Sequence, residues 1–260
     1  MQQGGERIKM SGCIVNYNDW QQTRTALESI FRLTEGCDLT MYVVDNNSDD
    51  DGLARLKSEF PQIVDIHMSD NKGFGHGHNA VLPLLDSEFH AIINPDIILQ
   101  SDVLTELAQY MRQNPDIGQI TPKILNTDGS VQVLGKRNPP FLALVGRNIF
   151  KKLLKPVADH YAMLDEDLTK PIDIQFATGC FSVVRTDVFK RLGGYDERYF
   201  LYFEDMDLTR KINGVARAVY YPYCSVVHEW DRAYSHKPKY FAIVLKSMLK
   251  YYAKWGFELI

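Results

Sequence analysis

Short apolar runs alternate with amphipathic stretches along the first half of the chain. The runs are rich in β-branched residues and too short for helices, which predicts buried strands over 13–15, 40–44, 64–68 and 91–93. The stretches between them repeat apolar residues at helical spacing, which predicts helices over 19–33, 53–60, 77–85 and 102–114, the last capped by Ser101. This alternation is typical of an α/β fold with a Rossmann-like, mostly parallel sheet flanked by helices.

The alternation ends after a further strand predicted over 117–121. Residues 126–130 predict a hairpin turn, and 137–170 contain no clear strand. A helix is expected over 208–213, with Gly214 ending it. No repeat, low-complexity tract or linker divides the sequence, so we expect a single domain over 1–260.

Polar residues follow two of the predicted strands at the point where each ends. Asn94-Pro95-Asp96 follows one strand, and Asp45 ends another. Ligands of open α/β sheets bind beyond the carboxyl ends of the strands, so both carboxylates are expected to face a ligand crevice. Asp96 suits a divalent cation beside a diphosphate, and Asp45 suits a base or ribose. A polar turn is the alternative for Asp96, and an Asx turn or helix cap for Asp45.

Glycines alternate in the loop 70–79, which leads into a predicted helix. Gly73, Gly75 and Gly77 allow a close approach of backbone to a ligand, and a helix N-terminus favours anions. A phosphate or a ribose hydroxyl is therefore a natural ligand. The spacing and position of these glycines do not fit the Rossmann fingerprint or a P-loop. A flexible turn with helix-capping glycines is the alternative.

Aromatic residues lead up to three acids, Glu204, Asp205 and Asp207. A carboxylate beside an apolar wall has a raised pKa, which suits Glu204 and Asp205 to general-base catalysis. For Asp207 we favour a role in stabilising the N-terminus of the helix that follows.

Composition is that of an ordinary globular protein, with 45% hydrophobic and 24% charged residues. A formal net charge of -4 leaves no basic surplus for phosphates, so no nucleic-acid partner is expected. Four cysteines without close spacing indicate reduced thiols in a cytoplasmic protein. The sequence has no N-terminal hydrophobic segment and no apolar run of membrane-spanning length, so neither secretion nor a membrane span is expected.

Six short motifs follow one another along the chain: Val15-Asn16-Tyr17-Asn18, Val44-Asp45-Asn46-Asn47-Ser48, Asn71-Lys72-Gly73-Phe74-Gly75, Asn94-Pro95-Asp96, Thr178-Gly179-Cys180 and Phe203-Glu204-Asp205-Met206-Asp207. Their order and approximate spacing resemble those of inverting family 2 glycosyltransferases with the GT-A fold. The resemblance spans about 11–234. Within the family the chain looks most like bacterial rhamnosyltransferases of cell-surface polysaccharide assembly, including O-antigen and lipopolysaccharide synthesis, which use dTDP-L-rhamnose.

The resemblance implies a nucleotide-sugar-binding half over 11–122, an acceptor and catalytic half over 123–234 and a C-terminal amphipathic helix over 235–260. Asp205 matches the catalytic base, with Glu204 beside it. Acceptor residues would be Thr178, Gly179 and Cys180. The residues implied to bind the donor are Val15, Asn16, Tyr17, Asp45, Asn71, Lys72, Gly73, Phe74, Gly75, Asn79 and Asn94.

The resemblance also implies a metal site for Mg²⁺ or Mn²⁺. Asp96 would be a ligand, while Asn94 stands where many relatives have an aspartate. His228 matches a histidine that completes this site in several relatives, although a lone histidine is otherwise more often a structural residue. The implied reaction moves L-rhamnose to a hydroxyl of a polyprenyl-diphosphate-linked saccharide with inversion. Alternatives are another sugar, such as N-acetylglucosamine or galactose from a UDP donor, or a catalytically silent glycan-binding protein.

Two basic stretches complete the sequence picture. The first consists of Arg137, Arg147, Lys151, Lys152 and Lys155, which suits a phosphorylated acceptor or a solvated helix face. The second lies in a predicted amphipathic helix over 237–255, with Phe241, Val244, Leu245, Met248, Tyr252 and Trp255 on one side and Lys239, Lys246, Lys250 and Lys254 on the other. This helix is expected to pack on the protein's own core or on a second subunit of a homodimer. The alternative is a peripheral contact with the anionic inner face of the cell membrane.

Overall fold

A computed structural model describes residues 6–141, 155–229 and 238–257 of the chain. Its strands are β1 (Ile8–Asn16), β2 (Cys37–Asp45), β3 (Val64–His67), β4 (Phe89–Ile93), β5 (Ile97–Leu99), β6 (Ile117–Leu125), β7 (Ile172–Asp173), β8 (Phe181–Arg185) and β9 (Arg217–His228). Its helices are α1 (Trp20–Leu33), α2 (Gly52–Glu59), α3 (Phe74–Asn79), α4 (Val103–Gln113), α6 (Lys155–Tyr161), α7 (Thr186–Arg191), α8 (Glu204–Asn213) and α9 (Pro238–Trp255).

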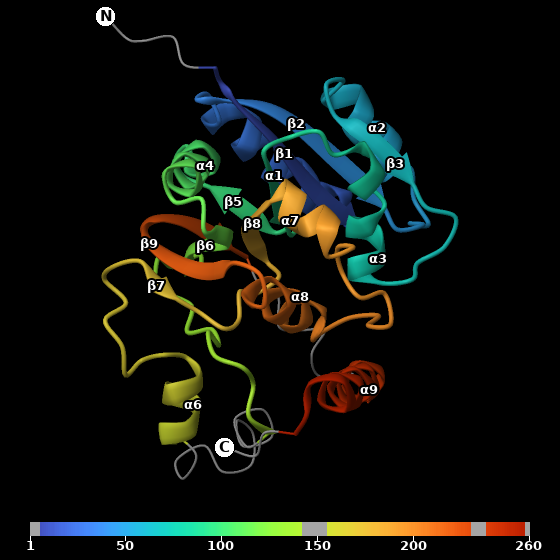
Figure 1. Cartoon of the computed structure of the whole chain (residues 1–260). Coiled ribbons are helices and arrows are strands. Elements are labelled where there is room, and N and C mark those ends of the chain that lie inside the picture. Colours follow the sequence, from blue (N-terminus) through green and yellow to red (C-terminus); the bar gives the residue numbers. More distant parts are fainter. Residues whose placement is uncertain (1–5, 142–154, 230–237, 258–260) are drawn as a thin grey trace, which may run out of the picture.

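The described strands form one sheet in the order β3-β2-β1-β4-β8-β6-β9-β5, with β7 paired to β9 (Figure 1). The first four strands are parallel, as the alternation of strands and helices predicts. β8 runs antiparallel to both β4 and β6, whereas β6 and β9 are parallel. The carboxyl ends of β1, β2 and β4 therefore meet at one edge, because parallel strands end on the same side of a sheet.

Helices cover both faces of the sheet because alternate side chains of a strand point to opposite faces. Ile14 of β1 and Val43 of β2 pack with α1, α2 and α4 in one apolar core. Their neighbours Val15 and Val44 belong to a second core, built with α7 and α8 on the other face. The run of buried residues on β1, β2 and β4 is thus explained by cover on both sides.

The helix predicted over 77–85 is wrong in its bounds. α3 begins earlier, after Gly73, and ends at Asn79, and a short 3-10 helix (Leu82–Leu84) follows. Pro83 in this turn has no N–H to donate to a continuing α-helix. The predicted cap of α4 is also wrong. Asp102, rather than Ser101, accepts the N–H of Thr105 at 3.2 Å.

The predicted hairpin turn over 126–130 is confirmed. The Asn126 N–H donates to the Ser130 carbonyl at 2.8 Å, and Gly129 has a φ of 81°. The turn brings Val131 beside Leu125, at the end of β6, in an antiparallel bridge. Residues 131–136 then run back along β6 toward the carboxyl edge, where pattern alone indicated no element.

The C-terminal helix α9 packs on the protein beside α8 (Figure 1). Met248 and Tyr251 are buried against Tyr199 and Phe203, which precede α8. The predicted amphipathic helix is therefore confirmed, and its partner in this structure includes the protein's own core. The side chain of Lys239 lies outside the described residues. Among the described helices, none is long and apolar enough to cross a membrane.

Candidate active site

A cleft of about 1010 Å³ opens at the carboxyl edge of the sheet, between the strand ends and helices α8 and α9. Polar side chains predicted from the sequence converge on it from strands, loops and the start of α8. The predicted residues that line the cleft are Phe74, Asn94, Asp96, Thr178, Gly179, Cys180, Glu204, Asp205 and His228. Much of the remaining wall is apolar, including Phe141, Tyr202 and five side chains of α9.

Asp205 lies in the first turn of α8 and is held by backbone donors. Its Oδ2 accepts the Gly179 N–H at 2.9 Å, and its Oδ1 accepts the Met206 N–H at 2.8 Å. Burial raises the pKa of Asp205 to about 6, although these backbone hydrogen bonds favour the charged form. A carboxylate that titrates near neutrality and faces a cleft is suited to accept a proton from a bound hydroxyl.

Glu204 stands beside Asp205 and is 5% exposed. Its Oε2 is buried without a hydrogen-bond partner among the described residues. Burial, and then the nearby charge of Asp205, raise the pKa of Glu204 well above its usual value, so Asp205 is the member of the pair that ionises first. Tyr202 and Phe203, just before Glu204, have φ values of 67° and 70°. Left-handed backbone at two bulky residues is strained, and here it turns the chain so that both acids face the cleft.

Asp96 and His228 meet across the adjacent ends of β5 and β9. Their Oδ2 and Nε2 atoms are 3.2 Å apart, and Asp96 Oδ1 is buried without a hydrogen-bond partner. Burial opposes the charged form of His228, but hydrogen bonds to Asp96 and Cys180 outweigh it and raise the pKa of His228 to about 10. Gln132 Oε1 accepts from His228 Nδ1 at 3.0 Å, and Gln132 Nε2 donates to the His228 carbonyl at 3.0 Å, which fixes the ring.

The Asp96 oxygen fits a divalent cation that takes its other ligands from a diphosphate and water. Coordination by His228 would also require its imidazole to lose the proton that Asp96 and Cys180 stabilise. No cluster of three or more acidic, histidine or cysteine ligands occurs in the described ranges. The two predicted metal residues therefore lie together, and a cation held there would depend on the donor for further oxygen ligands.

Asn16 and Asp45 are paired in register at the ends of β1 and β2. Asn16 Nδ2 donates to Asp45 Oδ1 at 2.9 Å, and Ser48 donates to the same carboxylate through both its N–H and its hydroxyl. Burial opposes ionisation, but the hydrogen bonds from Ser48 and Asn16 outweigh it and hold the pKa of Asp45 below its usual value. His67 Nδ1 lies 3.2 Å from the other oxygen. Asp45 thus accepts the N–H three residues on, as a capping residue does, rather than two residues on as in an Asx turn, and this bond fixes the carboxylate at the edge of the sheet.

The glycine loop docks directly on the segment that carries the acids. Phe74 N–H donates to the Phe200 carbonyl at 3.0 Å, and Asn71 accepts the N–H of Gly73. Gly73 has a φ of 109°, and a Cβ there would stand 2.0 Å from the Phe200 oxygen. Only glycine allows this approach, so the loop and the acidic turn form one wall of the site.

The other predicted donor residues lie in different settings. Asn79 donates to the Tyr195 carbonyl and to Glu197 and accepts the Tyr195 N–H, so its side chain braces the 195–197 loop. Lys72 forms an exposed ion pair with Asp70. Val15 is buried in the core of the sheet, and Tyr17 is 50% exposed.

The acceptor side joins the end of β4 to the acids. Asn94 N–H donates to the Cys180 carbonyl at 2.8 Å, which ties the strand end to the 178–180 turn. A Cβ on Gly179 would approach the Asp205 Cβ to 3.2 Å, so this turn lies flat against Asp205. Asp207 lies in the first turn of α8, where it was expected to stabilise the helix start, and it is fully buried and also accepts from Lys254 and Trp255 of α9.

Pattern reasoning missed Gln132, Lys136 and Tyr161, which come from segments without clear periodicity. The first basic stretch is only partly described, because Arg147, Lys151 and Lys152 lie outside the described residues. Its described members form ion pairs within the protein: Arg137 with Asp165 and Glu166, and Lys155 with Asp159.

A model of glycosyl transferase family 2 matches residues 11–193. The chain belongs to this family. It is a glycosyltransferase, and the predicted family and enzyme class are confirmed. The match covers β1 to α7 and includes the glycine loop and the Asp96 strand end, whereas the acids of α8 lie beyond it.

This glycosyltransferase is similar to N-acetylglucosaminyl-diphospho-decaprenol L-rhamnosyltransferase of Mycobacterium tuberculosis, at 24% identity over an alignment 228 residues long that covers 82% of this chain and 74% of that protein. It is also 26% identical to rhamnosyltransferase WbbL of Escherichia coli over 70% of each chain. A crystal structure of GalNAc-T7 with UDP, GalNAc and Mn²⁺ superposes with a TM-score of 0.72 at 14% identity, covering 96% of this chain and 48% of that one. The mixed sheet is therefore the GT-A fold.

Proposed function

We propose that this enzyme is a metal-dependent, inverting rhamnosyltransferase. It moves L-rhamnose from dTDP-L-rhamnose to a hydroxyl of a polyprenyl-diphosphate-linked saccharide in cell-surface polysaccharide synthesis. The names of the relatives support the sugar and the lipid-linked acceptor. The observation that carries the reaction type is Asp205, whose carboxylate titrates near neutrality in the cleft that Asp96 and His228 also line.

In the proposed mechanism Asp205 removes the proton of the acceptor hydroxyl while that oxygen attacks the anomeric carbon. The bond from this carbon to the diphosphate breaks on the opposite face, its electron pair leaves with dTDP, and the configuration inverts. Asp205 ends protonated. Glu204, kept neutral by burial and by the charge of Asp205, does not compete as base. A divalent cation held by Asp96 and His228 would neutralise charge on the leaving diphosphate.

Residues of the parallel strands are proposed to hold the nucleotide. Asn16 and Asp45, fixed by their mutual hydrogen bond, would meet the nucleoside. The Gly73 loop would present backbone N–H groups to the diphosphate, next to Phe74 in the cleft wall. Thr178 and Gly179 would position the acceptor beside the base.

A donor screen tests this proposal. The purified chain is incubated with dTDP-L-rhamnose, UDP-N-acetylglucosamine or UDP-galactose, with and without Mg²⁺ or Mn²⁺, and nucleotide release is measured. Transfer to a short-chain prenyl-diphosphate N-acetylglucosamine is then followed, with the anomeric configuration of the product read by NMR. Selective release from dTDP-L-rhamnose, dependent on metal and with inversion, supports the proposal. If the enzyme prefers a UDP sugar, that sugar replaces rhamnose in the proposal. If no donor releases its nucleotide, the result favours a catalytically silent glycan-binding protein.

A further inference from the structure

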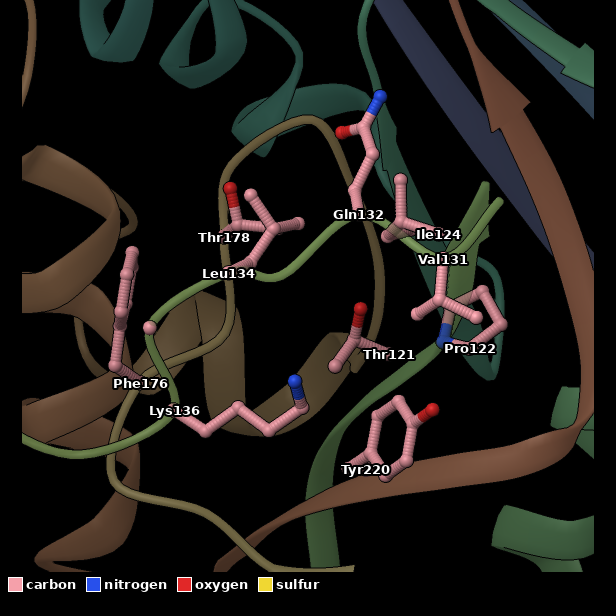
Figure 2. A pocket seen from close by; sticks show the side chains of 11 residues that line it. Thr121, Pro122, Ile124, Val131, Gln132, Leu134, Lys136, Phe176, Thr178 and Tyr220 are labelled. Carbon is pink, nitrogen blue, oxygen red and sulfur yellow. The ribbon is translucent and has the colours of Figure 1, made fainter. Parts of the chain in front are cut away.

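A small pocket beside the cleft holds a buried lysine (Figure 2). The pocket has a volume of about 20 Å³, enough for one water-sized group. Lys136 is 9% exposed, and its ammonium points into the pocket between Thr121 and the ring of Tyr220 (Figure 2). The pocket adjoins the cleft, because both are lined by Leu134, Gly135, Phe176 and Thr178.

Lys136 has no carboxylate partner within the described part of the chain. Its Nζ lies 4.8 Å from the centroid of the Tyr220 ring, which supplies only partial compensation for the charge. Burial lowers the pKa of Lys136 to about 8. The adjacent Arg137 is, by contrast, paired with both Asp165 and Glu166. A buried cation without a counter-ion costs stability, so a role in binding an anion explains its position better than a role in folding.

The backbone around Lys136 is fixed to the acceptor side of the cleft. Its carbonyl accepts the N–H groups of Gln175 and Phe176, at 2.7 and 3.0 Å, and its own N–H donates to the Tyr161 carbonyl at 2.9 Å. The chain continues from Phe176 through Thr178 to Gly179, which donates to Asp205. Lys136 is thus tied by hydrogen bonds to the segment that carries the proposed acceptor residues.

We propose that Lys136 binds one anionic oxygen of the acceptor's diphosphate. This inference rests on the proposed function, because a prenyl-diphosphate saccharide carries this anion next to the sugar whose hydroxyl reaches Asp205. The pocket admits a single oxygen rather than a whole phosphate, so the contact is one charge-assisted hydrogen bond from the ammonium. Thr178, shared by pocket and cleft, marks where the oxygen enters.

Protection of Lys136 from acylation tests the contact without requiring turnover. The protein is treated with an amine-acylating reagent at pH 8, and labelling of Lys136 is measured by mass spectrometry. The expected result is protection by prenyl-diphosphate N-acetylglucosamine and none by the matched alkyl glycoside without phosphate. Protection by dTDP alone, or by neither acceptor compound, would overturn the assignment.

Kinetics provide the second arm. Lys136→Met is expected to lower kcat/KM for the diphosphate acceptor roughly 10- to 100-fold, the range for loss of a charged hydrogen bond, while Lys136→Arg retains part of it. Lys123→Met, which removes a half-buried lysine of β6 that lines neither cavity, is the matched control. Between pH 7 and 9 the wild-type kcat/KM for the acceptor should fall above about pH 8, because Lys136 then loses its charge. Tyr220, the other titratable residue that lines the pocket, stays neutral over this range, because burial raises its pKa.

The failures of the two proposals are distinguishable. Donor hydrolysis without acceptor measures cleavage of the nucleotide sugar alone. Its rate should be the same in Lys136→Met and wild type. Donor hydrolysis with an unchanged acceptor kcat/KM in Lys136→Met would overturn only the role of Lys136. A lower melting temperature with unchanged acceptor kinetics would assign Lys136 a structural role through Tyr220.

Discussion

At the scale of single residues, the main feature is that two adjacent acids, Glu204 and Asp205, differ in their environments and pKa values. Glu204 is buried with a free oxygen, while the carboxylate of Asp205 is hydrogen-bonded by two backbone N–H groups. Environment separates their pKa values, so one acid is ionised while the other retains its proton. The same pattern marks acid and base assignments in other active sites.

The pH dependence of activity follows from Asp205. Its pKa is raised to about 6, so the carboxylate is ionised above this pH and protonated below it. We expect kcat/KM for the acceptor to fall as pH falls through about 6. Asp205→Asn should reduce transfer roughly 10²- to 10⁴-fold and leave donor binding intact, as expected for loss of a general base. Equal loss of donor binding, measured by calorimetry, would contradict the assignment.

The Asp96–His228 pair gives a prediction about metal. EDTA should abolish transfer, and added Mg²⁺ or Mn²⁺ should restore it. Asp96→Ala should weaken donor binding mainly when metal is present, because Asp96 lines the cleft and its Oδ1 has no hydrogen-bond partner among the described residues. Calorimetric titration of donor with and without metal compares the two proteins. Undiminished turnover of wild type in EDTA would reject the proposed metal role of both residues.

At the scale of elements, the glycine loop and the acidic turn depend on each other. A Cβ at residue 73 meets the Phe200 carbonyl oxygen at 2.0 Å, whereas a Cβ at Gly129, which has a φ of 81°, meets nothing within 4 Å. Both glycines have a positive φ, which costs an alanine about 1–2 kcal/mol in the left-handed helical region. Gly73, with a ψ of 177°, lies in a region that is essentially restricted to glycine. Only Gly73→Ala must also displace the segment that leads to Asp205.

We therefore expect Gly129→Ala to lower stability slightly and leave transfer unchanged, while Gly73→Ala lowers both stability and transfer. Chemical denaturation and donor hydrolysis measure the two effects. Equal behaviour of the variants in both measurements would show that the contact with Phe200 contributes nothing beyond backbone strain.

Elements with a clear pattern were predictable, and those set by tertiary contacts were not. β1, β2 and β4 are recognisable in the sequence as continuous apolar runs, because both faces of these strands are buried. β5 is three residues long, and its pairing with β9 depends on a strand more than a hundred residues away. From the sequence alone, Lys136 would be expected on the surface. It is buried because the 131–136 segment packs against Tyr220, which the sequence pattern does not indicate.

At the scale of the whole molecule, α9 is joined to α8 by a buried carboxylate. Asp207 accepts from Trp255 Nε1 at 2.7 Å and from Lys254 Nζ at 2.9 Å. Lys250 donates to the Arg198 carbonyl, so two of the predicted surface lysines have partners inside the protein. The helix also supplies one wall of the cleft, which links its docking to acceptor binding.

Removing the charge of Asp207 should weaken the docking of α9. Asp207→Asn leaves Lys254 paired with Asp196 alone, so we expect a loss of stability below about 3–5 kcal/mol, the cost of a buried charge left without any partner. Asp173→Asn is the control, because Asp173 forms an exposed pair with Arg217, worth about 0–1 kcal/mol. Urea denaturation measures both. A small, equal loss in the two variants would contradict the anchoring role of Asp207.

Membrane association is the last prediction, and it concerns the part of α9 that the core leaves uncovered. Phe241, Leu245 and Leu249 are 69%, 42% and 61% exposed, with exposed Lys246 among them. An apolar strip with a lysine suits shallow insertion into an anionic bilayer, so we expect weak binding to anionic vesicles that salt reverses. Truncation before Lys237 would also remove the Asp207 anchor, whereas Leu245→Asp with Leu249→Asp leaves it in place. Leu245 and Leu249 also line the cleft, so the melting temperature of the double variant is the check that it folds. Co-sedimentation should show loss of binding in this variant; equal binding of wild type and variant would place the contact elsewhere.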